Sequence, residues 1–125
     1  MGARTKVLIV DDNSDVRRLY AIGLNQRGFE VKLAANGAEA VERVASERPD
    51  VILLDWVMPL MDGGEVLSRL REASTAEIPV IVVSGQPQPE QIQGDPRIHS
   101  WLTKPITIDE LVAAMVGGTV VRQTG

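Results

Sequence analysis

Residues 7–12 (VLIVDD) and 51–55 (VILLD) share one pattern, in which four consecutive apolar residues are followed at once by aspartate. A third apolar run, in residues 80–84 (VIVVS), is followed by a serine. Unbroken apolar runs of this length are typical of parallel strands that are covered on both faces. The three runs therefore predict the interior strands of a parallel sheet.

The segments between these runs predict helices and two further strands. Apolar residues recur at helical spacing in four segments, which begin after Asn13, after Asn36-Gly37, after Asp62-Gly63 and at Ile108. Polar and apolar residues mix in residues 31–33 and 98–102, as they do in edge strands. Strands that alternate with helices indicate an α/β domain.

This alternation predicts the order of the strands in the sheet. With right-handed crossovers, the interior set of first, third and fourth strands gives the order 2-1-3-4-5, the flavodoxin-like doubly wound fold. A ligand site in this fold lies beyond the carboxyl ends of the first and third strands.

The connection before the fifth strand has an unusual composition. Pro87, Pro89, Gly94 and Pro96 fall close together, and only residues 90–93 could form about one helical turn. Proline inside a helix costs about 3 kcal/mol. The fourth helix of the fold is therefore expected to be short or irregular.

The composition of the 125 residues is that of one globular domain, with 44% hydrophobic residues and a net charge of −4. The chain contains no cysteine, which excludes disulfides and thiolate metal sites. The acidic balance argues against a broad nucleic-acid surface. No apolar run approaches the length of a membrane span, and residues 1–12 do not resemble a signal peptide. We therefore expect a cytoplasmic protein that binds neither nucleic acid directly nor membranes.

Polar side chains follow the predicted strands at their carboxyl ends. They are Asp11 and Asp12 after the first strand, Asp55 after the third, Ser84 after the fourth and Lys104 after the fifth. Because the carboxyl ends of parallel strands share one edge, these five side chains are expected to converge.

Three carboxylates at one point need a cation, and oxygen ligands without histidine or cysteine favour Mg²⁺. We expect Asp12 and Asp55 to bind it directly, the carbonyl of Val57 to be a third ligand, and Asp11 to act through water. Mg²⁺ together with Lys104 would leave room for a dianion such as a phosphoryl group. Asp55 could then be its covalent acceptor, with Ser84 as a hydrogen-bond donor to the phosphoryl oxygens.

These residues resemble the receiver domains of two-component response regulators, of the chemotaxis-Y type. The matching pieces are Asp11-Asp12-Asn13, Asp55 with Met58-Pro59 and Asp62-Gly63, Ser84-Gly85, and Lys104-Pro105. The resemblance covers about residues 5–118. Residues 1–125 are accordingly expected to form a single receiver domain, with residues 119–125 as a tail.

The resemblance implies a function as well as a fold. It implies Asp55 as phosphoacceptor, Asp11 and Asp12 as the acidic pocket, Lys104 as the phosphate-binding lysine and Ser84 as the switch hydroxyl. Such domains take a phosphoryl group from a histidine kinase or a histidine phosphotransfer protein, and they catalyse only their own phosphorylation and dephosphorylation.

The resemblance also implies two features near the fifth strand. One is a cis peptide bond before Pro105. The other is the switch aromatic, here Trp101 where the family usually has tyrosine or phenylalanine. The resemblance further implies that, on phosphorylation, Ser84 and the aromatic move inward and reshape the face formed by the fourth helix, the fifth strand and the fifth helix of the fold. It also allows for a dimer that depends on phosphorylation.

Arginine, tryptophan and histidine residues outside this set have simpler interpretations. Arg17-Arg18 is expected to be a solvated helix face, which could also help to dock a kinase. Trp56 is expected to point away from the site and to serve in packing or at the surface, and His99 is expected to be solvated.

Three alternative functions stay open. The chain could be a receiver module excised from a hybrid histidine kinase or a larger regulator. It could also be a flavodoxin-like cofactor binder, although Asp11-Asp12 would repel the phosphate of a flavin nucleotide. The third alternative is a small Mg²⁺ phosphohydrolase, in which a second aspartate often stands where this chain has Val57.

Overall fold

The computed structural model describes residues 4–58, 62–72 and 78–117, and no side chain is described for residues 71, 72, 116 and 117. The strands are β1 (Lys6–Val10), β2 (Glu30–Ala34), β3 (Val51–Asp55), β4 (Val80–Ser84) and β5 (Ile98–Thr103). The helices are α1 (Ser14–Gln26), α2 (Gly37–Glu47), α3 (Gly63–Glu72) and α4 (Ile108–Gly117).

The five strands form one parallel sheet in the order β2-β1-β3-β4-β5, which confirms the order predicted from the sequence. Every residue of β3 and β4 is buried, whereas β2 and β5 are largely half-buried or exposed. The contrast between unbroken and mixed apolar runs therefore separated interior strands from edge strands correctly.

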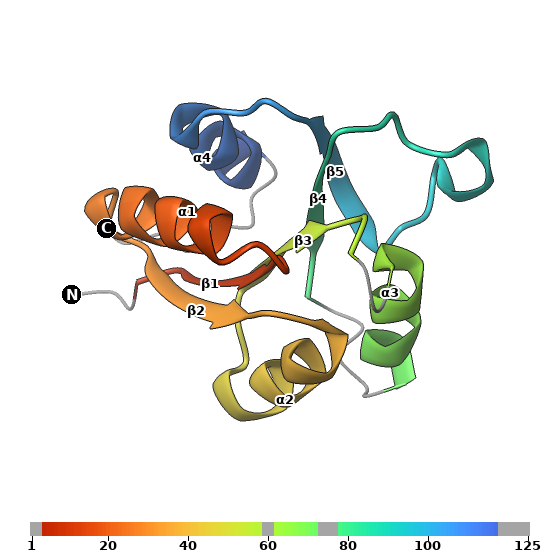
Figure 1. Cartoon of the computed structure of the whole chain (residues 1–125), viewed down its shortest axis with the longest axis horizontal. Helices are drawn as coiled ribbons and strands as arrows, with labels where there is room; N and C mark the ends of the chain where they lie inside the picture. The colour runs from red at the N-terminus through yellow and green to blue at the C-terminus, as the bar shows by residue number, and fades with distance from the viewer. Residues whose placement is uncertain (1–3, 59–61, 73–77, 118–125) are drawn as a thin grey trace.

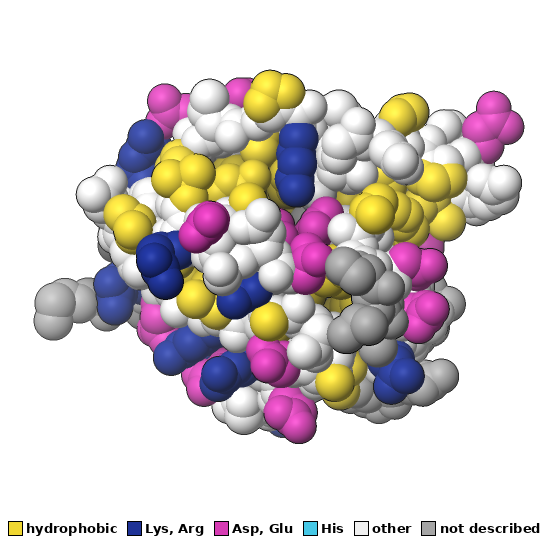
Figure 2. Space-filling model, in the orientation of Figure 1, with side chains coloured by type: hydrophobic (Ala, Val, Ile, Leu, Met, Phe, Trp, Pro, Cys, Tyr) yellow, Lys and Arg dark blue, Asp and Glu magenta, His cyan; other side chains and the backbone are white. Residues whose placement is uncertain are grey.

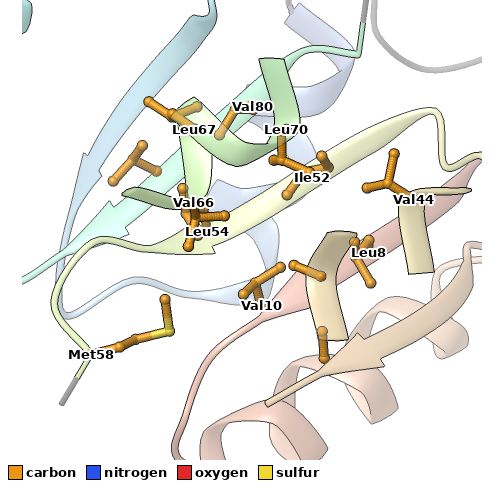
Figure 3. Packing of buried hydrophobic residues seen from close by; sticks show 13 residues of the cluster. Leu8, Val10, Val44, Ile52, Leu54, Met58, Val66, Leu67, Leu70 and Val80 are labelled. Carbon is orange, nitrogen blue, oxygen red and sulfur yellow. The ribbon is translucent and has the colours of Figure 1, made fainter. Parts of the chain in front are cut away.

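Helices cover the two faces of the sheet, with α1 and α4 on one face and α2 and α3 on the other (Figure 1). Each face has its own apolar cluster. On the α2 and α3 face, Val44, Val66, Leu67 and Leu70 pack against strand residues that include Leu54 (Figure 3). The cluster under α1 and α4 contains, from these helices, Tyr20, Leu24, Leu111 and Met115. Such burial on both faces fixes the alternation of strands and helices.

Short polar residues begin the first two helices. The side chain of Asn13 accepts hydrogen bonds from the N–H groups of Asp15 (2.9 Å) and Val16 (3.1 Å), as expected of an N-cap residue. Asn36 does the same for Glu39 at 2.9 Å. Gly28 follows α1 with a φ of +91°, a conformation that glycine adopts without strain.

The connection between β4 and β5 contains a single 3-10 turn, Glu90–Ile92, as the cluster of proline and glycine residues predicted. In Figure 1 this connection extends away from the sheet beyond β5.

Trp56 and Trp101 are partly buried against the α2 and α3 cluster.

Among the described residues, no helix has the length and apolar character required to cross a membrane.

Candidate functional site

The carboxyl ends of β1, β3, β4 and β5 bring the predicted polar residues to one edge of the sheet. Asp55 is the last residue of β3 and is paired in register with Val83, the neighbour of Ser84. Asp11 follows β1, and its N–H donates to the carbonyl of Ala34 at 3.1 Å, which continues the β1–β2 ladder by one step. The parallel topology therefore places residues that are far apart in sequence at the same edge.

Three carboxylates gather at this edge. Asp11, Asp12 and Asp55 each offer an oxygen, and these oxygens all lie within 4.8 Å of one another. Asp11 is 3% exposed and Asp55 is 9% exposed, while Asp12 is open to solvent. Figure 2 shows acidic side chains in a hollow at the centre of this face of the molecule. One side of the acidic cluster is thus buried and the other is accessible.

Lys104 lies beside the two buried carboxylates. Its Nζ is 3.8 Å from Oδ1 of Asp55 and 4.0 Å from Oδ2 of Asp11. The N–H of Lys104 donates to the carbonyl of Ser84 at 2.8 Å, and the following Lys104–Pro105 peptide bond is cis, as the family resemblance implied. The ammonium group therefore offsets part of the repulsion between the carboxylates.

Burial and mutual repulsion act on the protonation of the two buried acids. Burial, together with the charge of Asp11, raises the pKa of Asp55 from 3.8 to about 6, and Lys104 opposes this rise. Burial also raises the pKa of Asp11, against the hydrogen bond from the N–H of Asn13 and the charge of Lys104. A cation placed among these oxygens would favour their charged forms.

Ser84 and Trp101 are joined through one residue of the following loop. Oγ of the fully buried Ser84 accepts the N–H of Gln86 at 3.1 Å. Nε1–H of Trp101 donates to the carbonyl of Gln86 at 2.8 Å. The two residues that the resemblance assigned to a switch therefore bind the same loop residue, Ser84 through its N–H and Trp101 through its carbonyl.

The neighbours of Asp55 differ in exposure and in contact. Val57 is 56% exposed, and its N–H donates to Oδ1 of Asp55 at 3.4 Å. Trp56 packs against Trp101, with ring centroids 5.1 Å apart and planes at 58°. Trp56 is thus a packing residue, one of the two roles expected for it, and His99 is exposed, as expected. Pro59, which belongs to the quoted Met58-Pro59 pair, lies outside the described residues.

The expectation that Arg17-Arg18 form a solvated helix face is confirmed for Arg18 and not for Arg17. Arg18 is exposed, but Arg17 is only half-exposed, and its Nη1 donates to the carbonyl of Asp11 at 2.7 Å. One sequence feature could have suggested this contact. Arg17 lies in the second turn of the helix after Asp11-Asp12, and helical side chains lean toward the N-terminus of their helix. Sequence alone gave no reason to prefer Arg17 to Arg18.

Comparison with known proteins agrees with this arrangement. Residues 7–116 match the family model described as the response regulator receiver domain. The chain belongs to the family of response regulator receiver domains. It is therefore the receiver domain of a two-component response regulator, as the residues quoted from its sequence had suggested.

Receiver domains of known sequence and structure resemble the chain over most of its length. It is 38% identical over 112 residues to the response regulator MprA of Mycobacterium ulcerans, covering 88% of this chain and 48% of that protein. The chain thus spans about half the length of the curated relatives it matches.

Two solved structures show the same fold. The chemotaxis protein CheY4 of Vibrio cholerae matches with a TM-score of 0.83 and 31% identity, over 92% of this chain and 98% of that one. The receiver domain of the Francisella response regulator 1452 matches with a TM-score of 0.79 and 31% identity, over 92% and 97% of the two chains.

Proposed function

We propose that this receiver domain accepts a phosphoryl group on Asp55 from a phosphohistidine donor in a Mg²⁺-dependent reaction. The observation that carries the proposal is the position of Asp55, whose carboxylate lies among Asp11, Asp12 and the ammonium of Lys104. In the transfer, an Asp55 oxygen forms a bond to phosphorus as the bond from phosphorus to the histidine nitrogen breaks. The electron pair of the broken phosphorus–nitrogen bond remains on the nitrogen of the leaving imidazole.

Lys104 has a direct part in this reaction. Its Nζ lies 3.8 Å from Oδ1 of Asp55, close enough to interact with an oxygen of a phosphoryl group bound there. Preorganised positive charge stabilises the negative charge on phosphoryl oxygens during transfer. Lys104 is therefore proposed as the phosphate-binding lysine.

The acidic cluster has the donor set that Mg²⁺ prefers, since its three candidate ligands all offer carboxylate oxygens within 4.8 Å of one another. Asp12 and Asp55, with the carbonyl of Val57, are the proposed direct ligands, and Asp11 is proposed to act through water. When bound, Mg²⁺ would neutralise charge on the carboxylates and on the incoming phosphoryl oxygens.

Ser84 and Trp101 are the proposed switch residues. Oγ of Ser84 accepts the N–H of Gln86, which leaves its O–H free to donate to a phosphoryl oxygen. Movement of Ser84 toward that oxygen would act on Gln86 through this bond. A shift of Gln86 would reach Trp101, which donates to the carbonyl of that residue. The switch would then signal through contacts with other proteins near β5.

The limits of the module form part of the proposal. We propose that residues 1–125 contain a single receiver domain and that its reaction is confined to its own phosphorylation and dephosphorylation. A histidine kinase or a histidine phosphotransfer protein is the proposed donor. Because the chain matches about half the length of the curated relatives, it could function alone or as a module of a larger regulator.

Intact-mass measurement after incubation with Mg²⁺ and acetyl phosphate tests the assignment of the acceptor. We expect a single phosphoryl adduct on the wild-type chain and none on Asp55→Asn, because the amide has no carboxylate oxygen to form the acyl phosphate. Asp15→Asn, on the exposed first turn of α1, is the matched control and should take up the adduct as wild type does.

Two results would contradict the proposal. An adduct of equal stoichiometry on Asp55→Asn would place the acceptor elsewhere. An adduct that forms at the same rate with EDTA in place of Mg²⁺ would show that the acidic cluster does not use the cation.

A further inference from the structure

Arg17 makes a contact that places it next to the acidic cluster. It lies in the second turn of α1, where its own N–H donates to the carbonyl of Asn13 at 3.0 Å. Its side chain turns back toward the helix N-terminus, and Nη1 donates to the carbonyl of Asp11 at 2.7 Å. The guanidinium therefore binds main chain at the point where β1 ends.

This bond completes a set of contacts that hold Asp11 in place. The N–H of Asp11 donates to the carbonyl of Ala34 on the neighbouring strand at 3.1 Å. Oδ1 of Asp11 accepts the N–H of Asn13 at 3.0 Å, and Oδ2 lies 4.0 Å from Nζ of Lys104. Arg17 supplies the contact to the remaining polar group, the carbonyl.

The carbonyl of Asp11 belongs to the same rigid unit as the N and Cα atoms of Asp12, because a peptide group is planar. A hydrogen bond that fixes this carbonyl therefore fixes the direction in which the chain enters Asp12. Asp12 is the exposed member of the acidic cluster, so its carboxylate depends on its main chain for orientation.

The contact that Arg17 makes leaves the carboxylates of the cluster available to a cation. Among the described residues, its side chain donates to a main-chain carbonyl and forms no ion pair with a carboxylate of the cluster. The guanidinium charge by itself would repel a bound cation, so the directional hydrogen bond is the contact that would favour cation binding.

We infer that Arg17 is a positioning residue for the divalent cation, which holds the Asp11–Asp12 peptide so that the Asp12 carboxylate faces the cation site. The inference rests on the proposed function, because it assumes that the acidic cluster binds Mg²⁺. It concerns cation affinity, which can be measured without any phosphoryl transfer.

Titration of the chain with Mg²⁺, followed by tryptophan fluorescence, tests the inference, since Trp56 directly follows Asp55. We expect Arg17→Met to weaken Mg²⁺ binding by about 10-fold, the effect typical of groups that orient metal ligands. Arg18→Met is the matched control on the same helix turn, and its affinity should stay within about twofold of wild type. Asp12→Asn, which removes a proposed ligand, should lose most of the binding.

The sign of the effect separates positioning from charge. Loss of the guanidinium charge beside a cation site would by itself strengthen Mg²⁺ binding, because like charges repel, whereas loss of the orienting hydrogen bond would weaken it. We therefore expect Arg17→Met to have a higher dissociation constant for Mg²⁺ than wild type. A thermal unfolding curve for each variant shows that folded proteins are being compared, and Arg17→Gln, whose shorter amide falls short of the carbonyl, replaces Arg17→Met if that variant does not fold.

The outcomes separate this inference from the proposed function. Wild-type or tighter Mg²⁺ affinity in Arg17→Met would overturn the positioning role while Mg²⁺ still binds the wild-type chain. Failure of the wild-type chain to bind Mg²⁺ and to take up the phosphoryl group would instead overturn the proposed function, and the role of Arg17 with it.

Discussion

At the scale of single residues, Asp55 is subject to opposing influences. It is nearly buried and faces Asp11, and both conditions favour its neutral form. Lys104 and the N–H of Val57 favour the charged form, which is the form that can attack phosphorus. The resulting pKa of about 6 leaves Asp55 mostly ionised at neutral pH, yet under electrostatic stress that a bound cation would relieve.

The raised pKa of Asp55 predicts how the stability of the metal-free protein depends on pH. The folded-state pKa of Asp55 is raised from 3.8 to about 6, so the folded state holds this proton more tightly than the unfolded chain. The contribution of Asp55 to stability is therefore complete below about pH 4 and is lost as the pH rises through about 6. We expect wild type to lose on the order of 2–3 kcal/mol more than Asp55→Asn over this range.

Urea unfolding between about pH 4 and pH 7, in the presence of EDTA, measures this difference. Asp55→Asn is the reference because it retains every other titrating group. Parallel stability profiles for the two proteins would show that the Asp55 carboxylate is not under stress in the folded state.

At the scale of secondary structure, two tryptophan rings connect the end of β3 with β5 and the start of α3. Trp56 packs against Trp101, and its carbonyl accepts the N–H of Gly63 at 2.7 Å. The ring of Trp56 lies so close to Gly63 that a Cβ there would come 2.7 Å from Cδ2 and closer still to Cε3. Glycine at position 63 is therefore required by the close approach of this ring.

We expect Gly63→Ala to destabilise the fold by about 1–3 kcal/mol, because the added methyl group must displace the Trp56 ring or the first turn of α3. The change should also alter the near-ultraviolet circular dichroism of the tryptophans. Thermal and urea unfolding measure the loss of stability.

Gly64→Ala is the control for this substitution. A Cβ at Gly64 meets Oδ1 of Asp62 at 3.3 Å and the Trp56 ring only at 3.9 Å. Alanine also favours a helix over glycine by about 1 kcal/mol, so stability should change little or rise. Equal losses in the two variants would show that packing against Trp56 is not the cause.

At the scale of the whole molecule, the site joins segments that the sheet brings together from four places in the chain. Asp11, Asp55, Ser84 and Lys104 follow or end different strands, and all depend on the parallel register. A cation that binds the carboxylates of Asp11, Asp12 and Asp55 binds only the folded chain. Its binding free energy is therefore added to the stability of the whole domain.

We expect Mg²⁺ to raise the thermal midpoint of the wild-type chain. At 100 times the dissociation constant the added stability is about 2.7 kcal/mol, or roughly 10 °C for a domain of this size. Differential scanning calorimetry with Mg²⁺ and with EDTA measures the shift. Asp12→Asn should show a much smaller shift, and an equal shift in that variant would place the stabilising cation elsewhere.

Much of the molecule could be predicted from local patterns. The unbroken runs of β3 and β4 against the mixed runs of β2 and β5 were enough to predict the strand order, because burial on both faces leaves no place for polar residues. The prolines after β4 predicted the single 3-10 turn, since proline removes a backbone donor. The sequence also predicted that four site residues lie close together, because the carboxyl ends of parallel strands meet at one edge of the sheet. These residues are Asp11, Asp12, Asp55 and Lys104.

The tertiary structure alone decided three further features. It joined Arg17, and not Arg18, to the carbonyl of Asp11, it paired Trp56 with Trp101, and it raised the pKa of Asp55. Each depends on distances and burial between residues that sequence patterns do not relate, such as a helix side chain and a strand end. Periodicity determines which face of an element is apolar, whereas only packing determines which individual atoms on neighbouring elements meet.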